Sequence, residues 1–394
     1  MKLLIAFDKF KDSMTAPYAC ELAARAAATA FGEKVDIEQA PLTDGGEGFC
    51  SILTQVAGGR LSEHLVSGPL GQKVTAPIGW VQAEDLPSQV HALLPLAAGK
   101  IAVIEMASAA GLEQVPSEQR HPNNCTTYGV GQLIQIASTQ SADAILLGIG
   151  GSATSDIGFG ALEALGIQFL NTSGQALTNV TPADWDQIDQ ISGSTRGTIP
   201  PIFIACDVEN PLLGPQGAAA VYGPQKGLTP EEIEPFDHKA GTLAAKLCAA
   251  VDQNFSLKDI PGSGAAGGIG FALKVCCGAS FVAGFDLVTA WLDLETRMLR
   301  ADAVLSGEGK IDRSSLAGKG PIALIKAAAA ADKGAYLFAG ALEDGIEAEL
   351  SKLHQACQAF AISPKEMTLK EALAKGPENL ELSVTKALRS AAKR

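Results

Sequence analysis

The first forty residues alternate between a buried-strand pattern and a helix pattern. Leu3 to Phe7 is an apolar run between charged residues, which is typical of a strand buried on both faces. Ala16 to Phe31 has helical spacing, and Thr15 is suited to cap its start. The pattern repeats, with a strand predicted at residues 35–41 and a helix at residues 48–57. This β-α-β-α order predicts the opening of a parallel sheet.

The middle of the chain has a different pattern. Residues 64–81 alternate apolar and polar side chains around a Gly-Pro-Leu-Gly turn, which predicts an antiparallel hairpin. Further strands are predicted at residues 100–107, 144–147 and 201–208, and further helices at residues 127–137, 158–166 and 230–251. These elements predict a mixed α/β unit.

The parallel rhythm resumes near Leu287. Residues 301–309 predict a strand and then a loop, and a helix near residues 321–331 and a strand at residues 335–342 follow. One helix is predicted after Thr368. The simplest account is a discontinuous Rossmann-like or flavodoxin-like parallel-sheet domain with an inserted mixed α/β domain. The expected bounds are 1–62 with 288–394 for the first and 63–287 for the insertion, with the active-site cleft between them.

Composition argues against several classes of protein. The 394 residues have a formal charge of −13 and contain no basic run, which argues against a nucleic-acid partner. No apolar stretch approaches 18 residues, so no membrane span is expected, and the start lacks a signal-peptide pattern. Eight scattered cysteines without CxxC or His/Cys spacing argue against structural zinc. The expected compartment is the cytoplasm.

A glycine-rich loop follows the strand at residues 144–147. It contains Gly150, Gly151, Ser152 and Thr154 and leads into a helix pattern. Glycines let main-chain N–H groups converge on an anion, and the start of a helix adds partial positive charge. The loop therefore predicts a phosphate site, and a tight turn with ordinary caps is the alternative.

Acidic residues follow several predicted strands. They are Asp8, Asp44 and Asp207, together with the Glu308 to Asp312 segment. Ligands of open α/β sheets bind beyond the carboxyl ends of strands, so these acids are expected to converge on one crevice. Each one alone could instead cap a helix.

Lysines and hydroxyls accompany these acids. Lys11 and Ser13 are predicted at the start of the first helix, where a lysine is unfavourable unless an anion binds, and Lys226 lies in a glycine loop. No histidine lies in these segments, and no G-x-x-x-x-G-K-[ST] pattern occurs. Carboxylates, lysines, hydroxyls and glycine loops indicate phosphoryl transfer with Mg²⁺, in which an aspartate accepts the proton of an alcohol.

The sequence resembles the bacterial glycerate kinases of the class that makes 2-phosphoglycerate. The resemblance covers about residues 1–362 and rests on ten segments in the family's order. They are FDKFKDS, TDGGEG, SGPLG, IEMASAAGL, TTYGVGQLI, GIGGSATSDIG, CDVENPL, GPQKG, GSGAAGGIG and SGEGKIDRSSLAGKGP. The chain departs from the family at Lys9, where serine is usual, at Ser155, where asparagine is usual, and at Ile157, where glycine is usual. Because isoleucine is β-branched, a glycine-only conformation is not expected at Ile157.

The resemblance implies a two-domain enzyme that converts ATP and D-glycerate to ADP and 2-phospho-D-glycerate with Mg²⁺. Asp207 or Asp156 is expected to take the hydroxyl proton, with Lys11 as a further catalytic group. Expected substrate contacts are Asp8, Ser13, Asp44, Glu47, Ser152 and Asn210. Expected nucleotide or phosphate contacts are Gly150, Gly151, Thr154, Gly307, Glu308 and Lys226, and expected metal ligands are Asp44 and Asp312.

Three other readings stay open at this point. Transfer to the 3-hydroxyl would give 3-phosphoglycerate. The G-x-G-x-x-G letters at residues 262–267 suggest a nicotinamide oxidoreductase, although neither an apolar strand before them nor an acid-bearing strand after them supports it. A non-enzymatic two-lobed binding protein is the third. The oligomeric state is open, and a homodimer is one of the states considered.

Overall fold

The chain forms two compact units. The computed structural model describes residues 1–195, 197–313, 315, 320–346, 349, 357–364 and 366–391. The first unit comprises Met1–Asp44 and Val288–Arg394, and the second comprises Gly45–Leu287. The second unit is thus inserted into the first. The inserted unit begins at Gly45 and not at residue 63, because helix α2 (Phe49–Val56) packs on strands of the second unit.

The first unit is built on one parallel sheet. Its strands are β1 (Lys2–Phe7), β2 (Asp36–Gln39), β11 (Ala303–Ile311), β12 (Gly334–Leu342) and β13 (Cys357–Ala361). Their order across the sheet is β13-β12-β11-β1-β2, and every neighbouring pair is parallel. This is the flavodoxin-like order 2-1-3-4-5. The connections from β1 and from β11 run in opposite directions, so the switch point of the sheet lies between these two strands.

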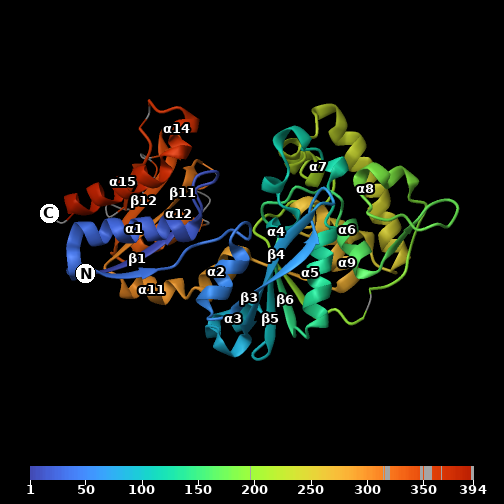
Figure 1. The fold of residues 1–394 in the computed structure, drawn as a ribbon, viewed down its shortest axis with the longest axis horizontal. Coiled ribbons are helices and arrows are strands. Elements are labelled where there is room, and N and C mark those ends of the chain that lie inside the picture. The colour runs from blue at the N-terminus through green and yellow to red at the C-terminus, as the bar shows by residue number, and fades with distance from the viewer. Residues whose placement is uncertain are drawn as a thin grey trace. The chain divides into compact units, whose positions relative to one another are not determined.

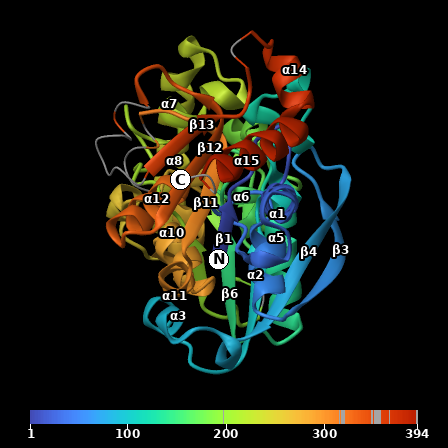
Figure 2. The same cartoon turned by 90° about the vertical axis from the view of Figure 1, so that its left-hand side faces the viewer.

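Helices cover both faces of this sheet. They are α1 (Ala16–Phe31), α11 (Leu294–Arg300), α12 (Gly320–Ala330), α14 (Leu369–Ala374) and α15 (Gly376–Ala391). Helices α1 and α15 lie side by side over one face, and α11 lies on the opposite side (Figures 1 and 2). Leu3, Ile5 and Phe7 alternate along β1 toward the alanine-rich side of α1, which lets the helix approach the sheet closely. The Thr15 hydroxyl caps α1, as predicted.

The carboxyl-terminal tail is two helices and not the single helix that was predicted. Helix α14 ends before Gly376, and α15 begins there. A Cβ atom added at Gly376 would lie 2.1 Å from the Ser13 hydroxyl. The close approach to Ser13 therefore requires a glycine at the break between the helices.

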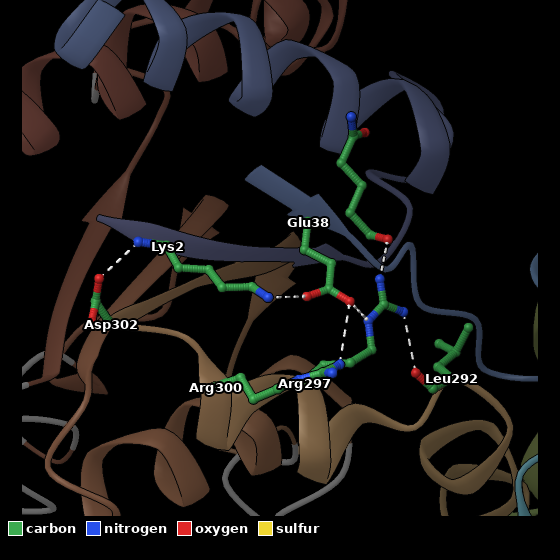
Figure 3. Close-up of polar contacts among 7 residues, drawn as sticks. Lys2, Glu38, Leu292, Arg297, Arg300 and Asp302 are labelled. Carbon is green, nitrogen blue, oxygen red and sulfur yellow. Dashed lines mark hydrogen bonds and ion pairs between the residues drawn. The ribbon is translucent and has the colours of Figure 1, made fainter. Parts of the chain in front are cut away.

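An ion-pair network fixes helix α11 to strand β2 (Figure 3). Arg297 Nε donates to Glu38 Oε1 at 2.7 Å, and its guanidinium also donates to the main-chain oxygens of Gln39 and Leu292. Lys2 Nζ lies 3.4 Å from the other Glu38 oxygen. Burial acts to raise the pKa of Glu38, but Arg297 and Lys2 outweigh it and hold this pKa below its usual value.

The second unit has a mixed sheet. Its strands are β3 (Arg60–Ser67), β4 (Lys73–Gln82), β5 (Lys100–Glu105), β6 (Ala144–Gly148), β9 (Ile202–Ala205) and β10 (Ser280–Val282), in the order β10-β9-β6-β5-β4-β3. Strands β5, β6, β9 and β10 are parallel, and β3 and β4 form the predicted antiparallel hairpin. Strands β7 (Gln168–Leu170) and β8 (Gln190–Ser192) form a separate small sheet.

The second unit also contains helices of different lengths. They are α2, α3 (Ser88–Leu93), α4 (Ala107–Ala110), α5 (Tyr128–Thr139), α6 (Phe159–Leu165), α7 (Ala218–Tyr222), α8 (Pro230–Ala250) and α9 (Ile269–Cys277). Helix α10 (Gly284–Trp291) leads back toward the first unit along the chain. Among the described residues, no helix combines the length and the apolar character that crossing a bilayer requires.

Candidate functional site

A large pocket opens at the carboxyl ends of the parallel strands of the first unit. Its volume is about 770 Å³, and its described lining comes from the segments after β1, β2, β12 and β13 and from the carboxyl-terminal part of β11. This edge of the sheet includes the switch point between β1 and β11, which is where ligands of this sheet order bind. The pocket thus brings together Asp8, Lys11, Ser13, Asp44 and Glu308, all of which were singled out from the sequence.

The acids of this pocket act on one another. Asp8 is nearly buried, and its Oδ1 accepts the Lys9 main-chain N–H at 2.7 Å. Burial, and next the charge of Asp8, raise the pKa of Glu308 to about 7, with smaller effects from Asp44 and Asp312. A neutral pH therefore leaves Glu308 partly protonated. Negative charge is therefore in excess around Glu308.

Among the described residues, Lys9, Lys11 and Lys310 line the same pocket. Lys9 Nζ lies 3.1 Å from Asp44 Oδ1, and Lys310 Nζ lies 3.2 Å from Asp312 Oδ2. The Lys11 side chain is exposed and makes no ion pair within the described part of the chain. Lys9, which departs from the family pattern, therefore partly neutralises Asp44, and Lys11 is available to an anion.

Two predicted contact residues of the first unit have structural tasks. The Ser13 hydroxyl donates to the Leu373 main-chain oxygen at 2.7 Å and so fixes helix α14. Gly307 lies inside β11, where an added Cβ atom would be 1.8 Å from the Phe338 main-chain oxygen. The segment predicted as a loop continues as strand to Ile311 because it pairs with β12 through Leu342. Gly307 therefore serves strand packing and does not line the pocket among its described residues.

Two glycine loops of the second unit pack against each other. Gly150 N donates to Gly45 O at 2.9 Å, and a Cβ atom added at Gly150 would lie 2.6 Å from Gly46 N. A Cβ atom added at Gly151 would lie 2.2 Å from Glu47 Oε1. Gly150 is thus required for the backbone contact between the loops, and the Glu47 carboxylate lies over Gly151.

Lys226 is inside the second unit. Its Nζ donates to Ser152 Oγ at 2.9 Å and to Thr154 O at 2.6 Å, and 2 % of the residue is exposed. Burial lowers the pKa of Lys226 to about 8, although the charge of Asp156 opposes this. In the described part of the chain, the buried hydroxyls of Thr154 and Ser155 have no hydrogen-bond partner. Lys226 therefore holds the glycine loop from within.

Asp156 anchors the loop that precedes helix α6. The residue is fully buried, and its carboxylate accepts hydrogen bonds from Thr127 N and Oγ1 and from Gly158 and Gly160 N. Burial raises the pKa of Asp156, and these hydrogen bonds oppose the shift. A carboxylate enclosed in this way is unsuited to receive a proton from a bound substrate.

Asp207 follows strand β9 and is only partly buried. Its Oδ2 accepts the Phe285 N–H at 2.8 Å, and a Cβ atom added at Gly284 would lie 2.8 Å from the same oxygen. Asn210 donates to Gln216 O and accepts from the Tyr222 hydroxyl. Asn210 thus stabilises its own loop, and Asp207 is the more accessible of the two predicted bases.

Ile157 adopts a left-handed conformation with φ of 57°. The expectation that isoleucine would prevent a glycine-like conformation here is wrong. The side chain is 1 % exposed and packs in a core with Phe159 and Leu212. Burial of the side chain therefore outweighs a backbone cost of about 1–2 kcal/mol.

This strain leads to a prediction at Ile157. Ile157→Ala removes buried apolar contacts and keeps the strain, so a loss of about 2–4 kcal/mol in the free energy of unfolding is expected. Ile157→Gly loses slightly more contact but relieves the strain, so it should be at least as stable as the alanine variant. Urea unfolding of both variants measures which of the two is more stable. At Ile134 in helix α5, which is also buried, glycine should be about 1 kcal/mol less stable than alanine. The same order at Ile157 would contradict the prediction.

The G-x-G-x-x-G segment is not a dinucleotide-binding turn. It follows the 3-10 helix η8 (Phe255–Asp259) and not a strand, and it leads into the 3-10 helix η9 (Ala265–Gly268). Cβ atoms added at Gly264 and Gly267 would lie 2.0 Å from Pro211 O and 2.1 Å from Thr154 O. These glycines serve close backbone packing, as the sequence context indicated.

The sequence interpretation missed the wall of the pocket beyond β12 and β13. This wall includes Gly340, Leu342, Ile362, Met367 and Leu373. The available signal was the apolar stretch Ala359 to Ile362, in and after β13, a strand that the sequence analysis did not predict. Its use in a pocket depends on which strands are neighbours, which local patterns do not show.

Comparison with known proteins gives the family. A sequence model described as the glycerate kinase family matches residues 3–392. The chain belongs to the glycerate kinase family. Glycerate kinase of Bacillus subtilis (strain 168) is 36 % identical over 388 residues, covering 97 % of this chain and 95 % of that protein. Glycerate 2-kinase of Escherichia coli (strain K12) is 35 % identical over 353 residues, covering 88 % and 87 %.

A solved structure supports the fold. The crystal structure of a protein designated glycerate kinase 2 from Salmonella typhimurium LT2 has a TM-score of 0.75 and 33 % identity, covering 100 % of this chain and 98 % of that one. The family consists of phosphotransferases with an alcohol group as acceptor, which act on small molecules and, as kinases, imply ATP as donor. The discontinuous α/β fold expected from the sequence is confirmed.

Proposed function

We propose that the protein transfers the γ-phosphoryl group of ATP to the 2-hydroxyl of D-glycerate, giving ADP and 2-phospho-D-glycerate. The observation that carries this proposal is the pocket at the switch point of the first unit, with acids and lysines together, in a member of the glycerate kinase family. The likeness to the E. coli protein named glycerate 2-kinase supports the choice of hydroxyl.

The residues of the pocket fit a magnesium ion. The described part of the chain holds no group of three or more acidic, histidine or cysteine side chains arranged for a metal. Mg²⁺ usually takes only one or two protein carboxylates, with phosphate oxygens and water completing its shell. The excess of negative charge around Glu308 indicates that a cation would be favoured there. Asp44 and Asp312 would hold the ion, and the ion would neutralise charge on the phosphates.

Some of the other residues would contact the reactants, and others would support the glycine loop. Lys11 would bind the phosphates, and Asp8 and Asp44 would orient the reactants. Asp207 would accept the proton of the 2-hydroxyl while the new O–P bond forms and the bond to the ADP oxygen breaks. Lys226 and Asp156 would support the glycine loop from inside. The cleft expected between the two units stays a prediction.

The test is identification of the product. Purified protein incubated with ATP, Mg²⁺ and D-glycerate is expected to give a 2-phosphoglycerate signal in phosphorus NMR, whereas omission of glycerate should leave ATP intact. A 3-phosphoglycerate signal would keep the kinase and overturn the position of transfer. Intact ATP in the complete mixture would overturn the proposed function.

A further inference from the structure

The pocket of the first unit has two chemically different ends. At the β1 and β2 end, Asp8, Lys11 and Asp44 make the lining charged. At the β13 end the described lining is largely apolar: Ser363 is polar, and the rest is Ala361, Ile362, Pro364, Met367, Leu369, Ala372, Leu373 and Gly376. A single small hydroxy acid has no part that would occupy the apolar end.

The pocket is also long and large. Strand β13 lies three strand spacings from β1 in the sheet order. At about 4.8 Å per spacing, the two ends are ~14 Å apart. The volume of about 770 Å³ lies in the range of pockets that enclose drug-sized ligands. The length and the lining therefore suit an elongated ligand with one charged end and one apolar end.

The apolar wall is held in place by specific contacts. Ser13 fixes α14 through Leu373 O, and a capping box between Thr368 and Glu371 begins that helix. Asn379 Nδ2 lies 3.7 Å from Met367 Sδ and positions this side chain from helix α15. A wall that is fixed before binding lowers the entropy cost of holding a ligand.

We infer that this pocket binds the donor nucleotide lengthwise, with the base between the 361–364 turn and helix α14 and the phosphates at the β1 and β11 end. The inference rests on the proposed function for the identity of the donor as ATP. The charge pattern determines the direction, because a triphosphate cannot be buried against apolar side chains without a large desolvation cost. At the other end, lysines and a divalent cation shared with the acids would receive it.

A matched pair of substitutions on α14 tests the inference. Ala372 lines the pocket, whereas Ala374 on the same helix is exposed and is not among the described lining residues. Binding of a non-hydrolysable ATP analogue with Mg²⁺ to the full chain is measured by calorimetry, without glycerate. Ala372→Phe is expected to weaken binding at least tenfold, and Ala374→Phe should change it less than twofold. Equal affinities for the two variants, with both folded, would overturn the inference.

A measurement on the unmodified protein covers the case in which Ala372→Phe fails to fold. Photolabelling with 8-azido-ATP, followed by peptide mass analysis, is expected to place the adduct within residues 361–376, with excess ATP preventing it. An adduct confined to the second unit would overturn the inference, even if 2-phosphoglycerate is formed. Labelling at the α14 wall without any phosphoglycerate would instead keep the pocket assignment and reject the proposed function.

Discussion

Asp156→Ala should lower the free energy of unfolding of the second unit by about 3–5 kcal/mol. The change would leave four buried donors, on Thr127, Gly158 and Gly160, without their acceptor. Asp156→Asn retains an oxygen for the three bonds made by Oδ2 but places an amide opposite Gly158 N, so a loss of about 1–3 kcal/mol is expected. Urea unfolding followed by circular dichroism measures both losses.

Turnover measurements and a control at a surface aspartate distinguish a structural role of Asp156 from a role as general base. Asp186 is an exposed acid paired with Lys239, and Asp186→Ala should change stability by less than about 0.5 kcal/mol. If Asp156 is an anchor, the asparagine variant should keep turnover within about tenfold wherever it is folded. A drop in kcat of about 10²–10⁴ at unchanged stability would mean that Asp156 is the general base after all.

Lys11→Met should lower kcat/KM for ATP by about 100-fold, which corresponds to about 2.7 kcal/mol of transition-state stabilisation. Lys11 is exposed and lines the same pocket as Asp8 and Glu308. Loss of this lysine would leave the phosphates facing uncompensated acids. Since the side chain is exposed, the free energy of unfolding should change by less than about 0.5 kcal/mol. Steady-state kinetics with each substrate varied in turn measures the effect.

The control for Lys11 is another exposed lysine. Lys34 lies in the 3-10 helix η1 (Gly32–Lys34) and outside the described lining of the pocket, so Lys34→Met should leave kinetics unchanged. A rise in KM for glycerate alone in Lys11→Met would assign Lys11 to the acceptor and contradict its role at the phosphates. Lys11→Arg should restore part of the activity, because it keeps the charge and changes the shape of the contact.

Much of the fold could be predicted from local patterns. The run Leu3 to Phe7, the helix after Thr15 and the hairpin in residues 64–81 are all present, since period, caps and turn residues act over a few positions. The prediction of a single carboxyl-terminal helix was wrong. The chain breaks at Gly376, where the close approach of Ser13, which is distant in the sequence, leaves no room for a side chain. The inserted unit begins at Gly45 and not at the predicted residue 63, again because of contacts between distant residues: α2 packs on strands that come later in the chain.

The candidate site, too, could be predicted only in part from local patterns. Acids at strand ends identified the charged end of the pocket, but Asp207 belongs to the other unit and Gly307 to a strand interior. Asp156 and Lys226 had the residue types of catalytic groups, and only their burial showed that they support a loop. The apolar wall on α14 carried no motif at all.

By itself, the sequence determined the α/β class, the insertion of one domain into another, the family and the residue types available for phosphoryl transfer. Only the tertiary structure decided that the β13-to-β2 order places a switch point between β1 and β11, and that the two glycine loops pack against each other. It also decided which polar side chains are enclosed. Local patterns record short-range preferences, whereas strand order, close backbone approach and burial arise from contacts between residues far apart in the chain, which leave no period in the sequence.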